Sequence, residues 1–86
     1  MEKLWSDNAW DEYLYWQEHD KKMLKRINAL VKDIERNGAS KGIGKPERLK
    51  CQPSWSRRID DTNRLTYRID ADGFLHILSC KGHYED

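Results

Sequence analysis

Arg64-Leu65-Thr66-Tyr67-Arg68-Ile69 alternates strictly between polar and apolar side chains. Successive side chains of a β-strand point to opposite faces of the sheet, so this pattern predicts a strand with one polar and one apolar face. Turn-forming residues bound the strand on both sides, at 60–63 (Asp-Asp-Thr-Asn) and at 70–73 (Asp-Ala-Asp-Gly). The segment is therefore predicted to be the middle strand of an antiparallel meander.

The segments beyond these two turns supply the other strands of the meander. Ser54 to Ile59 is predicted to be a strand, and the nearly continuous apolar run from Phe74 to Cys80 predicts a central strand buried on both faces. Arg57 and Arg58 must occupy opposite faces of their strand, so only one of them can share a face with Arg64. The turn does not fix the register, and both arginines stay candidates at this point.

The N-terminal half is predicted to contain a short strand at Lys3-Leu4-Trp5 and two helices. Apolar spacing predicts the first helix over about 7–17, and Asp20 can cap a second helix that ends at Asn37-Gly38. The apolar stripe of the second helix is the strongest helical signal in the chain and consists of Met23, Ile27, Leu30 and Ile34.

Together these elements predict an α+β fold: a short N-terminal strand, a two-helix hairpin and an antiparallel three-stranded meander, with the helices on one face of the sheet. The 86 residues are expected to form one small domain, 1–86. The segment from Asn37 to Pro46 contains three glycines and is predicted to be a loop.

Composition argues against several classes of protein. No apolar run approaches the ~20 residues that a membrane helix needs, and the N-terminus lacks the apolar core of a signal peptide. Cys51 and Cys80 form neither a disulfide framework nor a metal-binding pattern, which predicts reduced thiols in a cytoplasmic protein. Because the chain shows no set of metal ligands and no glycine-rich phosphate loop, we expect no metal and no cofactor.

Charge is unevenly distributed, although the net charge is only +1. Residues 41–68 carry eight lysines and arginines against three acids, a net +5, and the remainder of the chain is net −4. One interpretation is an ordinary solvated surface. The other is a basic face that binds a phosphate backbone.

Three residues together match the needs of RNA cleavage without a metal. Glu47 lies among cations that favour its ionised form, so its carboxylate can accept the proton of a ribose 2′-hydroxyl. His83 follows the last strand, and imidazole holds and releases a proton near neutral pH. Arg64 lies on the polar face of its strand, where a guanidinium can hold the extra negative charge of the transition state.

The other candidates fit this chemistry less well. His19 lies at a helix break and is expected at the surface. His76 is expected to lie in the core or on a face of the sheet, with its ring hydrogen-bonded. A nucleophilic pair of Cys80 with His83 is disfavoured, because Cys80 is expected in the core. Tyr84 could stack on a base or bind a phosphate.

Six segments, in this order, resemble a known family. They are Leu4-Trp5-Ser6, Trp10-Asp11-Glu12-Tyr13-Leu14-Tyr15-Trp16-Gln17, Gly44-Lys45-Pro46-Glu47, Trp55-Ser56-Arg57-Arg58-Ile59, Arg64-Leu65 with Tyr67, and the terminal His83-Tyr84. Over essentially the whole chain they resemble the YoeB/Txe toxins of the RelE superfamily. The resemblance implies a microbial-ribonuclease-like, RelE-type fold and ribosome-dependent cleavage of mRNA in the A site.

The resemblance also implies a role for single residues. Glu47 is expected to be the general base, His83 the general acid and Arg64 the transition-state stabiliser. Arg58, rather than Arg57, is then the arginine that contacts phosphate. Tyr84 is expected to orient the RNA, and Lys50 to contact its backbone. Family chains commonly stop at His-Tyr, whereas this chain continues with Glu85-Asp86.

The implied partners are a YefM/Axe-type antitoxin and the 70S ribosome with its mRNA, to which Lys41 and Lys45 would contribute contacts with ribosomal RNA. The oligomeric state stays open, with a homodimer as one alternative. Two rival functions remain: a non-catalytic RNA- or ribosome-binding module that uses the same basic face, and a small interaction protein whose aromatic residues serve a partner.

Overall fold

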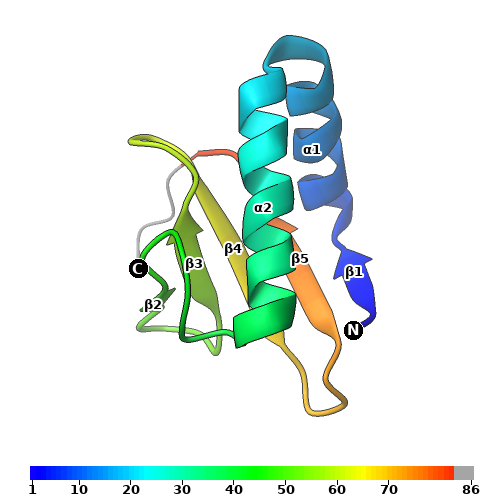
Figure 1. Cartoon of the computed structure of the whole chain (residues 1–86). Coiled ribbons are helices and arrows are strands. Elements are labelled where there is room, and N and C mark those ends of the chain that lie inside the picture. Colours follow the sequence, from blue (N-terminus) through cyan, green and yellow to red (C-terminus); the bar gives the residue numbers. More distant parts are fainter. Residues whose placement is uncertain (83–86) are drawn as a thin grey trace.

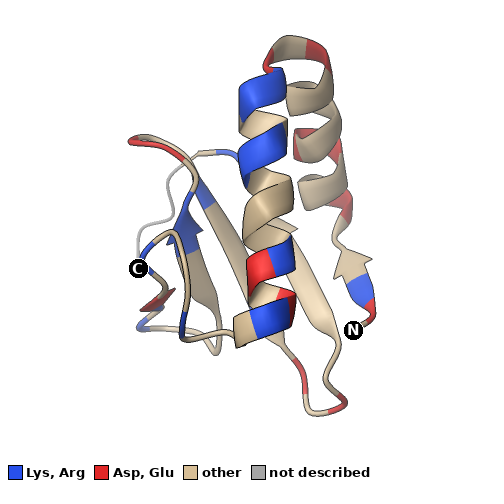
Figure 2. Ribbon diagram, in the orientation of Figure 1, with Lys and Arg blue, Asp and Glu red and all other residues tan. Residues whose placement is uncertain are grey.

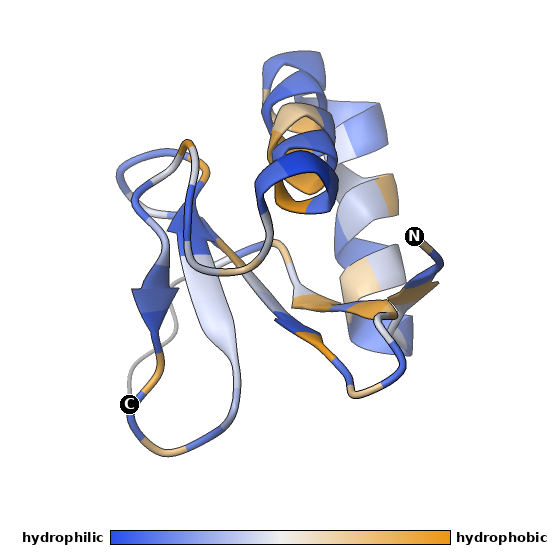
Figure 3. Cartoon of the chain, turned by 60° about the horizontal axis from the view of Figure 1, so that its bottom comes forward, coloured by the Kyte–Doolittle hydropathy of each residue, from blue (hydrophilic) through white to orange (hydrophobic). Residues whose placement is uncertain are grey.

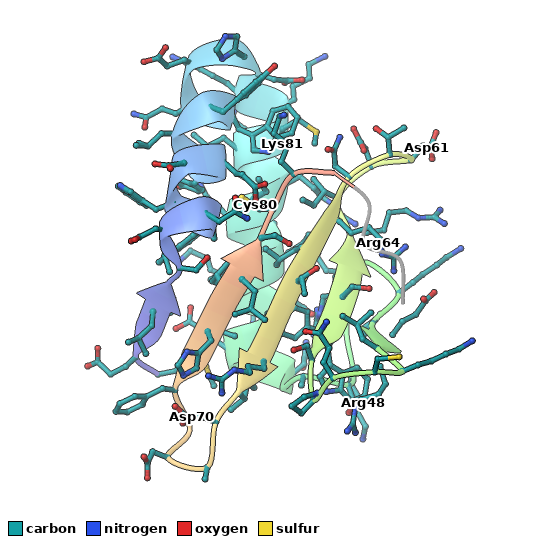
Figure 4. The ribbon with its side chains drawn as sticks, turned by 180° about the vertical axis from the view of Figure 1, so that it is seen from behind. Arg48, Asp61, Arg64, Asp70, Cys80 and Lys81 are labelled. Atoms are coloured by element: carbon teal, nitrogen blue, oxygen red, sulfur yellow. The ribbon has the colours of Figure 1, made fainter. Side chains whose placement is uncertain are left out.

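The computed structural model describes residues 1–82. Within this range, helices α1 (Asp7–His19) and α2 (Lys21–Asn37) cover one face of a five-stranded sheet (Figure 1). The strands are β1 (Lys3–Trp5), β2 (Glu47–Arg48), β3 (Trp55–Arg58), β4 (Arg64–Ile69) and β5 (Leu75–Ser79), in the spatial order β1-β5-β4-β3-β2. Seen from behind, the other face of the sheet has no helix in front of it (Figure 4). We call it the open face.

The α+β class, the helix hairpin and the antiparallel β3-β4-β5 meander are confirmed, but four strands follow the helices rather than three. The additional strand, β2, lies in a region that the sequence predicted to be the end of a loop. Two residues are too few to show a period, and β2 exists because its backbone pairs with β3. The short N-terminal strand is also confirmed, and its parallel pairing with β5 makes the sheet mixed.

β5 is a central strand, as predicted, because it lies between β1 and β4. The prediction that it is buried on both faces is wrong. Leu75 and Ile77 are fully buried on the helix side, whereas His76 and Leu78 are half-buried on the open face. No second layer of the described residues covers that face, so an apolar run in the sequence does not imply burial on both sides.

Side chains cap both helices as their sequences suggest. Ser6 accepts a hydrogen bond from the Ala9 N–H at the start of α1. Asp20 accepts hydrogen bonds from the N–H groups of Lys22 and Met23 and so starts α2. Helix α1 extends two residues beyond the predicted end. The hydrophobic residues of the two helices face those of the sheet (Figure 3), and together they form the core.

Arg57 lies on the helix side of β3 and is completely buried. Its guanidinium donates to the Asp33 carboxylate of α2 at 2.5 Å and to the Tyr67 hydroxyl of β4 at 2.9 Å. It also donates to three carbonyl oxygens of the loop that follows α2, those of Gly38, Lys41 and Ile43. The side chain is therefore a structural anchor that joins α2, the sheet and the loop.

The loop 38–46 takes its shape from this anchor. The Tyr67 hydroxyl donates to the Ala39 carbonyl, and the Ile43 N–H donates to Asp33. Gly44 has a φ of +84°, and a Cβ at this position would lie 2.8 Å from the side chain of Leu30. The Gly44 carbonyl accepts a hydrogen bond from the Arg58 N–H at 2.7 Å, which fixes the loop against the edge of β3.

Cys80 is completely buried in the core, as the sequence predicted. Burial raises the pKa of its thiol to about 12, because a thiolate there would lose its hydration. Cys51 is exposed. Neither helix is long and apolar enough to cross a membrane.

We expect Arg57→Met to lower the free energy of unfolding by ~3–5 kcal/mol, because it leaves the Asp33 carboxylate without its counter-ion and three loop carbonyl groups without their donor. Urea denaturation measures this loss. Arg57 holds the pKa of Asp33 below its ordinary value. The stabilisation of the fold by the Arg57–Asp33 pair should therefore be complete above about pH 4. It should disappear as the pH falls through the pKa that Asp33 has in the folded protein.

The control is Arg58→Met, which removes the exposed neighbour and should change stability by no more than ~0.5 kcal/mol. Similar losses for the two variants, or a loss for Arg57→Met that does not shrink in acid, would contradict the role assigned to the buried pair.

The two cysteines should differ sharply in reactivity. At pH 8 a thiol reagent such as a disulfide dye should modify Cys51 alone in the folded protein, and both cysteines once the protein is unfolded in urea. Counting the modified thiols by mass spectrometry tests this. Rapid modification of Cys80 in the folded chain would show that the core is open to solvent.

Candidate functional site

The register of three strands gathers a set of polar residues on the open face. Arg58 lies opposite Arg64, and Ser56 lies opposite Thr66 on one side and Glu47 on the other. Cross-strand partners share a face of the sheet, so these five side chains belong to one surface. This register answers the question that strand alternation left open, in favour of the arginine that the family resemblance had indicated. Arg58 shares the face of Arg64, and Arg57 points to the opposite side.

Arg64 is held firmly but its hydrogen-bonding capacity is not exhausted. Its Nε donates to Ser56 Oγ at 3.1 Å, and its side chain is only 13% exposed. Its Nη2 is buried and has no hydrogen-bond partner among residues 1–82. Buried donors in proteins are nearly always paired, so this unpaired one calls for an explanation such as a water, an ion or a role in catalysis.

Glu47 lies next to this arginine. One of its carboxylate oxygens is 3.7 Å from Arg64 Nη2, which is an ion pair but too long for a hydrogen bond. The Glu47 side chain is 65% exposed, so its oxygens stay accessible. The structure therefore places an accessible carboxylate beside a fixed guanidinium, and the catalytic roles of these two residues stay predictions.

The described chain ends beside the same arginine. The Gly82 carbonyl accepts a hydrogen bond from the Arg64 N–H at 3.0 Å, and the Gly82 N–H donates to Asn63 Oδ1 at 2.8 Å. One residue earlier, the Lys81 ammonium lies 4.6 Å from the centre of the Tyr15 ring. His83 and Tyr84, the predicted acid and the predicted RNA-orienting residue, lie outside the described residues.

The three predicted lysines are exposed and lie in the loops that flank β2. Lys41 and Lys45 belong to the loop 38–46 that Arg57 anchors, and Lys45 follows Gly44, the residue bonded to Arg58. Lys50 lies in the turn between β2 and β3, which is closed by a hydrogen bond from the Leu49 N–H to the Ser54 carbonyl. They surround the site rather than form part of its polar surface.

Sequence reasoning missed one residue of the site and misjudged the basic face. Ser56 orients Arg64 and is almost completely buried; alternation along the strand would have placed it beside Arg58. Arg57 was counted in the net +5 of residues 41–68, yet it is buried and paired with Asp33. The exposed basic face of this segment is therefore smaller by one cation.

The two described histidines have structural partners. His76 Nε2 lies 2.8 Å from Asp70 Oδ2, and His19 Nδ1 lies 2.8 Å from the Tyr15 carbonyl oxygen, so both behave as predicted. Among residues 1–82, no group of three or more histidines, cysteines or acids lies close enough to hold a metal ion.

Comparisons with known proteins identify the family of this chain. Residues 5–84 match the family model of the YoeB-like toxin of bacterial type II toxin–antitoxin systems. Toxin YoeB of Escherichia coli (strain K12) is 49% identical over 86 residues, which is 98% of this chain and 100% of that protein.

Solved structures show the same relationship. A YoeB dimer from Staphylococcus aureus has a TM-score of 0.91, and YoeB in a heterotetrameric YoeB–YefM toxin–antitoxin complex from the same species has 0.90. Each is 49% identical and covers 98% of both chains. YafQ of Escherichia coli shares the fold alone, with a TM-score of 0.79 at 14% identity. The match covers 95% of this chain and 92% of the YafQ chain. The chain therefore belongs to the YoeB toxin family of type II toxin–antitoxin systems.

Proposed function

We propose that this chain is an endoribonuclease toxin that cleaves mRNA in the ribosomal A site without a metal ion. The observation that carries the proposal is the accessible Glu47 carboxylate 3.7 Å from Arg64 Nη2. The Arg64 guanidinium is held by Ser56, and its Nη2 has no hydrogen-bond acceptor among the described residues. A base beside a preorganised cation is what attack of a 2′-hydroxyl on the adjacent phosphate requires.

In this mechanism Glu47 takes the proton of the ribose 2′-hydroxyl, whose oxygen then attacks phosphorus. Arg64 holds the negative charge that develops on the non-bridging oxygens, and Arg58 binds a neighbouring phosphate. The bond to the 5′-oxygen breaks as His83 donates a proton to it. The products are a 2′,3′-cyclic phosphate and a free 5′-hydroxyl, so atoms and charge balance without water or metal.

Two further features support this assignment. The described region ends at Gly82, which is hydrogen-bonded to the backbone of Arg64, and the proposed acid His83 is the next residue in the sequence. Lys50 is proposed to contact the RNA backbone and Tyr84 to stack on a base. A non-catalytic RNA-binding module would use the same cations but would not need Glu47.

The family also indicates the partners of this chain. Its Staphylococcus aureus relatives form a dimer and a complex with the antitoxin YefM. We therefore propose that an acidic, YefM/Axe-like antitoxin segment neutralises this chain by pairing with Arg58 or Arg64, or by displacing His83-Tyr84, and that a homodimer forms. A ribosome-dependent toxin would act in the cytoplasm.

Glu47→Gln and His83→Ala should each reduce the rate of cleavage by about 10²–10⁴, the range of one proton-transfer catalyst. Cleavage by the wild-type chain should leave 2′,3′-cyclic phosphate ends and persist in excess EDTA, with single-turnover kinetics and mass spectrometry of the products as readouts. The matched control, Glu2→Gln, lies far from the site in sequence and should be as active as the wild type. A requirement for Mg²⁺, or cleavage of a 2′-deoxy linkage, would exclude the mechanism.

Messenger RNA on a ribosome with an empty A site should be cleaved far faster than the same RNA free in solution. The site has few residues that can position a phosphate, and accurate positioning is worth many kcal/mol. Lys41→Gln with Lys45→Gln should raise KM and flatten its salt dependence, because two phosphate contacts are lost. Equal rates on free and ribosome-bound mRNA would indicate a self-sufficient ribonuclease instead.

A further inference from the structure

The first two turns of α2 form a second basic surface. They carry Lys21, Lys22, Lys25 and Arg26 and no acid. By their place in the sequence these four cations fall in the acidic remainder of the chain, whose net charge is −4. In space that remainder divides. α1 is rich in acids, whereas the first turns of α2 carry cations alone and its C-terminal half carries both signs of charge (Figure 2).

These cations are electrostatically unfavourable where they lie. The N-terminus of a helix carries a partial positive charge, so lysines and arginines in the first turns weaken the helix. Two like-charge pairs at i and i+4, Lys21 with Lys25 and Lys22 with Arg26, weaken it further. None of the four side chains forms an ion pair with an acid of the described chain. Local conflicts of this kind are expected where residues serve a function rather than the fold.

The surface joins the candidate site at Arg58. Arg26 Nη2 donates to the Arg58 carbonyl oxygen at 3.4 Å, so the start of α2 lies against the end of β3. Lys22 precedes Arg26 by one helical turn and lies on the same side of α2. Cations therefore continue from the open face, around the end of β3 and onto α2, although 32 residues separate Arg26 from Arg58.

The chemistry of this surface fits phosphates better than a peptide. An antitoxin segment that folds on binding must bury apolar side chains, and the exposed large hydrophobic residues of the described chain lie elsewhere: Met1, Leu4, Trp10, Leu14, Tyr15, Ile43 and Phe74. Helix α2 exposes none of them. A surface of cations without apolar contacts is typical of binding to a nucleic-acid backbone.

We propose that Lys21, Lys22, Lys25 and Arg26 bind the phosphate backbone of ribosomal RNA and so dock the toxin with its open face toward the mRNA. The inference rests on the proposed function, because it names a second contact between this chain and the ribosome. Docking through α2 leaves Arg58, Arg64 and Glu47 free for the scissile linkage.

The test compares two double variants of the same helix. Lys22→Gln with Lys25→Gln removes two cations from the surface and leaves the contact of Arg26 with Arg58 intact. Lys32→Gln with Arg36→Gln removes the same charge from the C-terminal half of α2, where cations suit the helix dipole and Asp33 and Glu35 lie nearby in sequence. Binding to 70S ribosomes is measured by sedimentation at several salt concentrations, together with KM for cleavage of ribosome-bound mRNA.

The first pair should weaken ribosome binding about tenfold, raise KM in parallel and reduce the slope of log affinity against log salt by about 1–2, since roughly one counterion is released for each phosphate contact. The second pair should change affinity less than about twofold. The first pair should also melt at a temperature equal to or above that of the wild type, because like-charge repulsion is relieved; lost binding is then not lost folding.

If both double variants weaken ribosome binding equally, the effect is one of net charge and the proposal is wrong. The proposal is also wrong if neither double variant alters ribosome binding. Weaker binding of an acidic YefM-like antitoxin with unaltered ribosome binding would assign the surface to the antitoxin instead. If the wild-type chain binds ribosomes but does not cleave their mRNA, the proposed catalytic function fails, and the comparison of binding still decides the role of α2.

Discussion

The buried ion pair between Arg57 and Asp33 is the interaction on which the rest of this molecule depends. A guanidinium without access to water is costly unless each of its donors finds an acceptor. Here one carboxylate, one hydroxyl and three loop carbonyls supply those acceptors. The same bonds shape the loop 38–46, which has no regular secondary structure and leads directly to Glu47. A structural charge on the helix side thus sets the geometry from which the site on the open face begins.

Adjacent arginines in β3 have opposite roles for one geometric reason. Side chains alternate across a strand, so Arg57 enters the core and Arg58 faces solvent opposite Arg64. Ser56, two residues before Arg58, then lies where it can hold the Arg64 guanidinium. A single strand of four residues therefore supplies an anchor of the fold, a proposed phosphate contact and the residue that orients the proposed transition-state stabiliser.

Charge on this protein follows the tertiary structure rather than the order of the sequence. The basic segment 41–68 loses one exposed cation to the core, and the start of α2 adds four beside it. If both belong to one docking surface, the toxin presents phosphate contacts on the open face and on its flank. Such an extended surface would allow a chain with net charge +1 to bind a large polyanion.

Local chemistry in the sequence was sufficient for the helices with their caps at Ser6 and Asp20, for the alternating strand β4 and for the burial of Cys80. Six short segments also showed the resemblance to the YoeB family. The sequence indicated Glu47 and Arg64 as site residues, and the structure places them next to each other. The roles proposed for them remain predictions. The family resemblance also favoured Arg58 over Arg57. Tertiary structure alone decided the existence of β2, the open second face of β5, the register that pairs Arg58 with Arg64, and the position of α2 beside Arg58. Those features depend on pairing between distant backbones and on what covers each surface, and neither leaves a periodic signal in the residues involved.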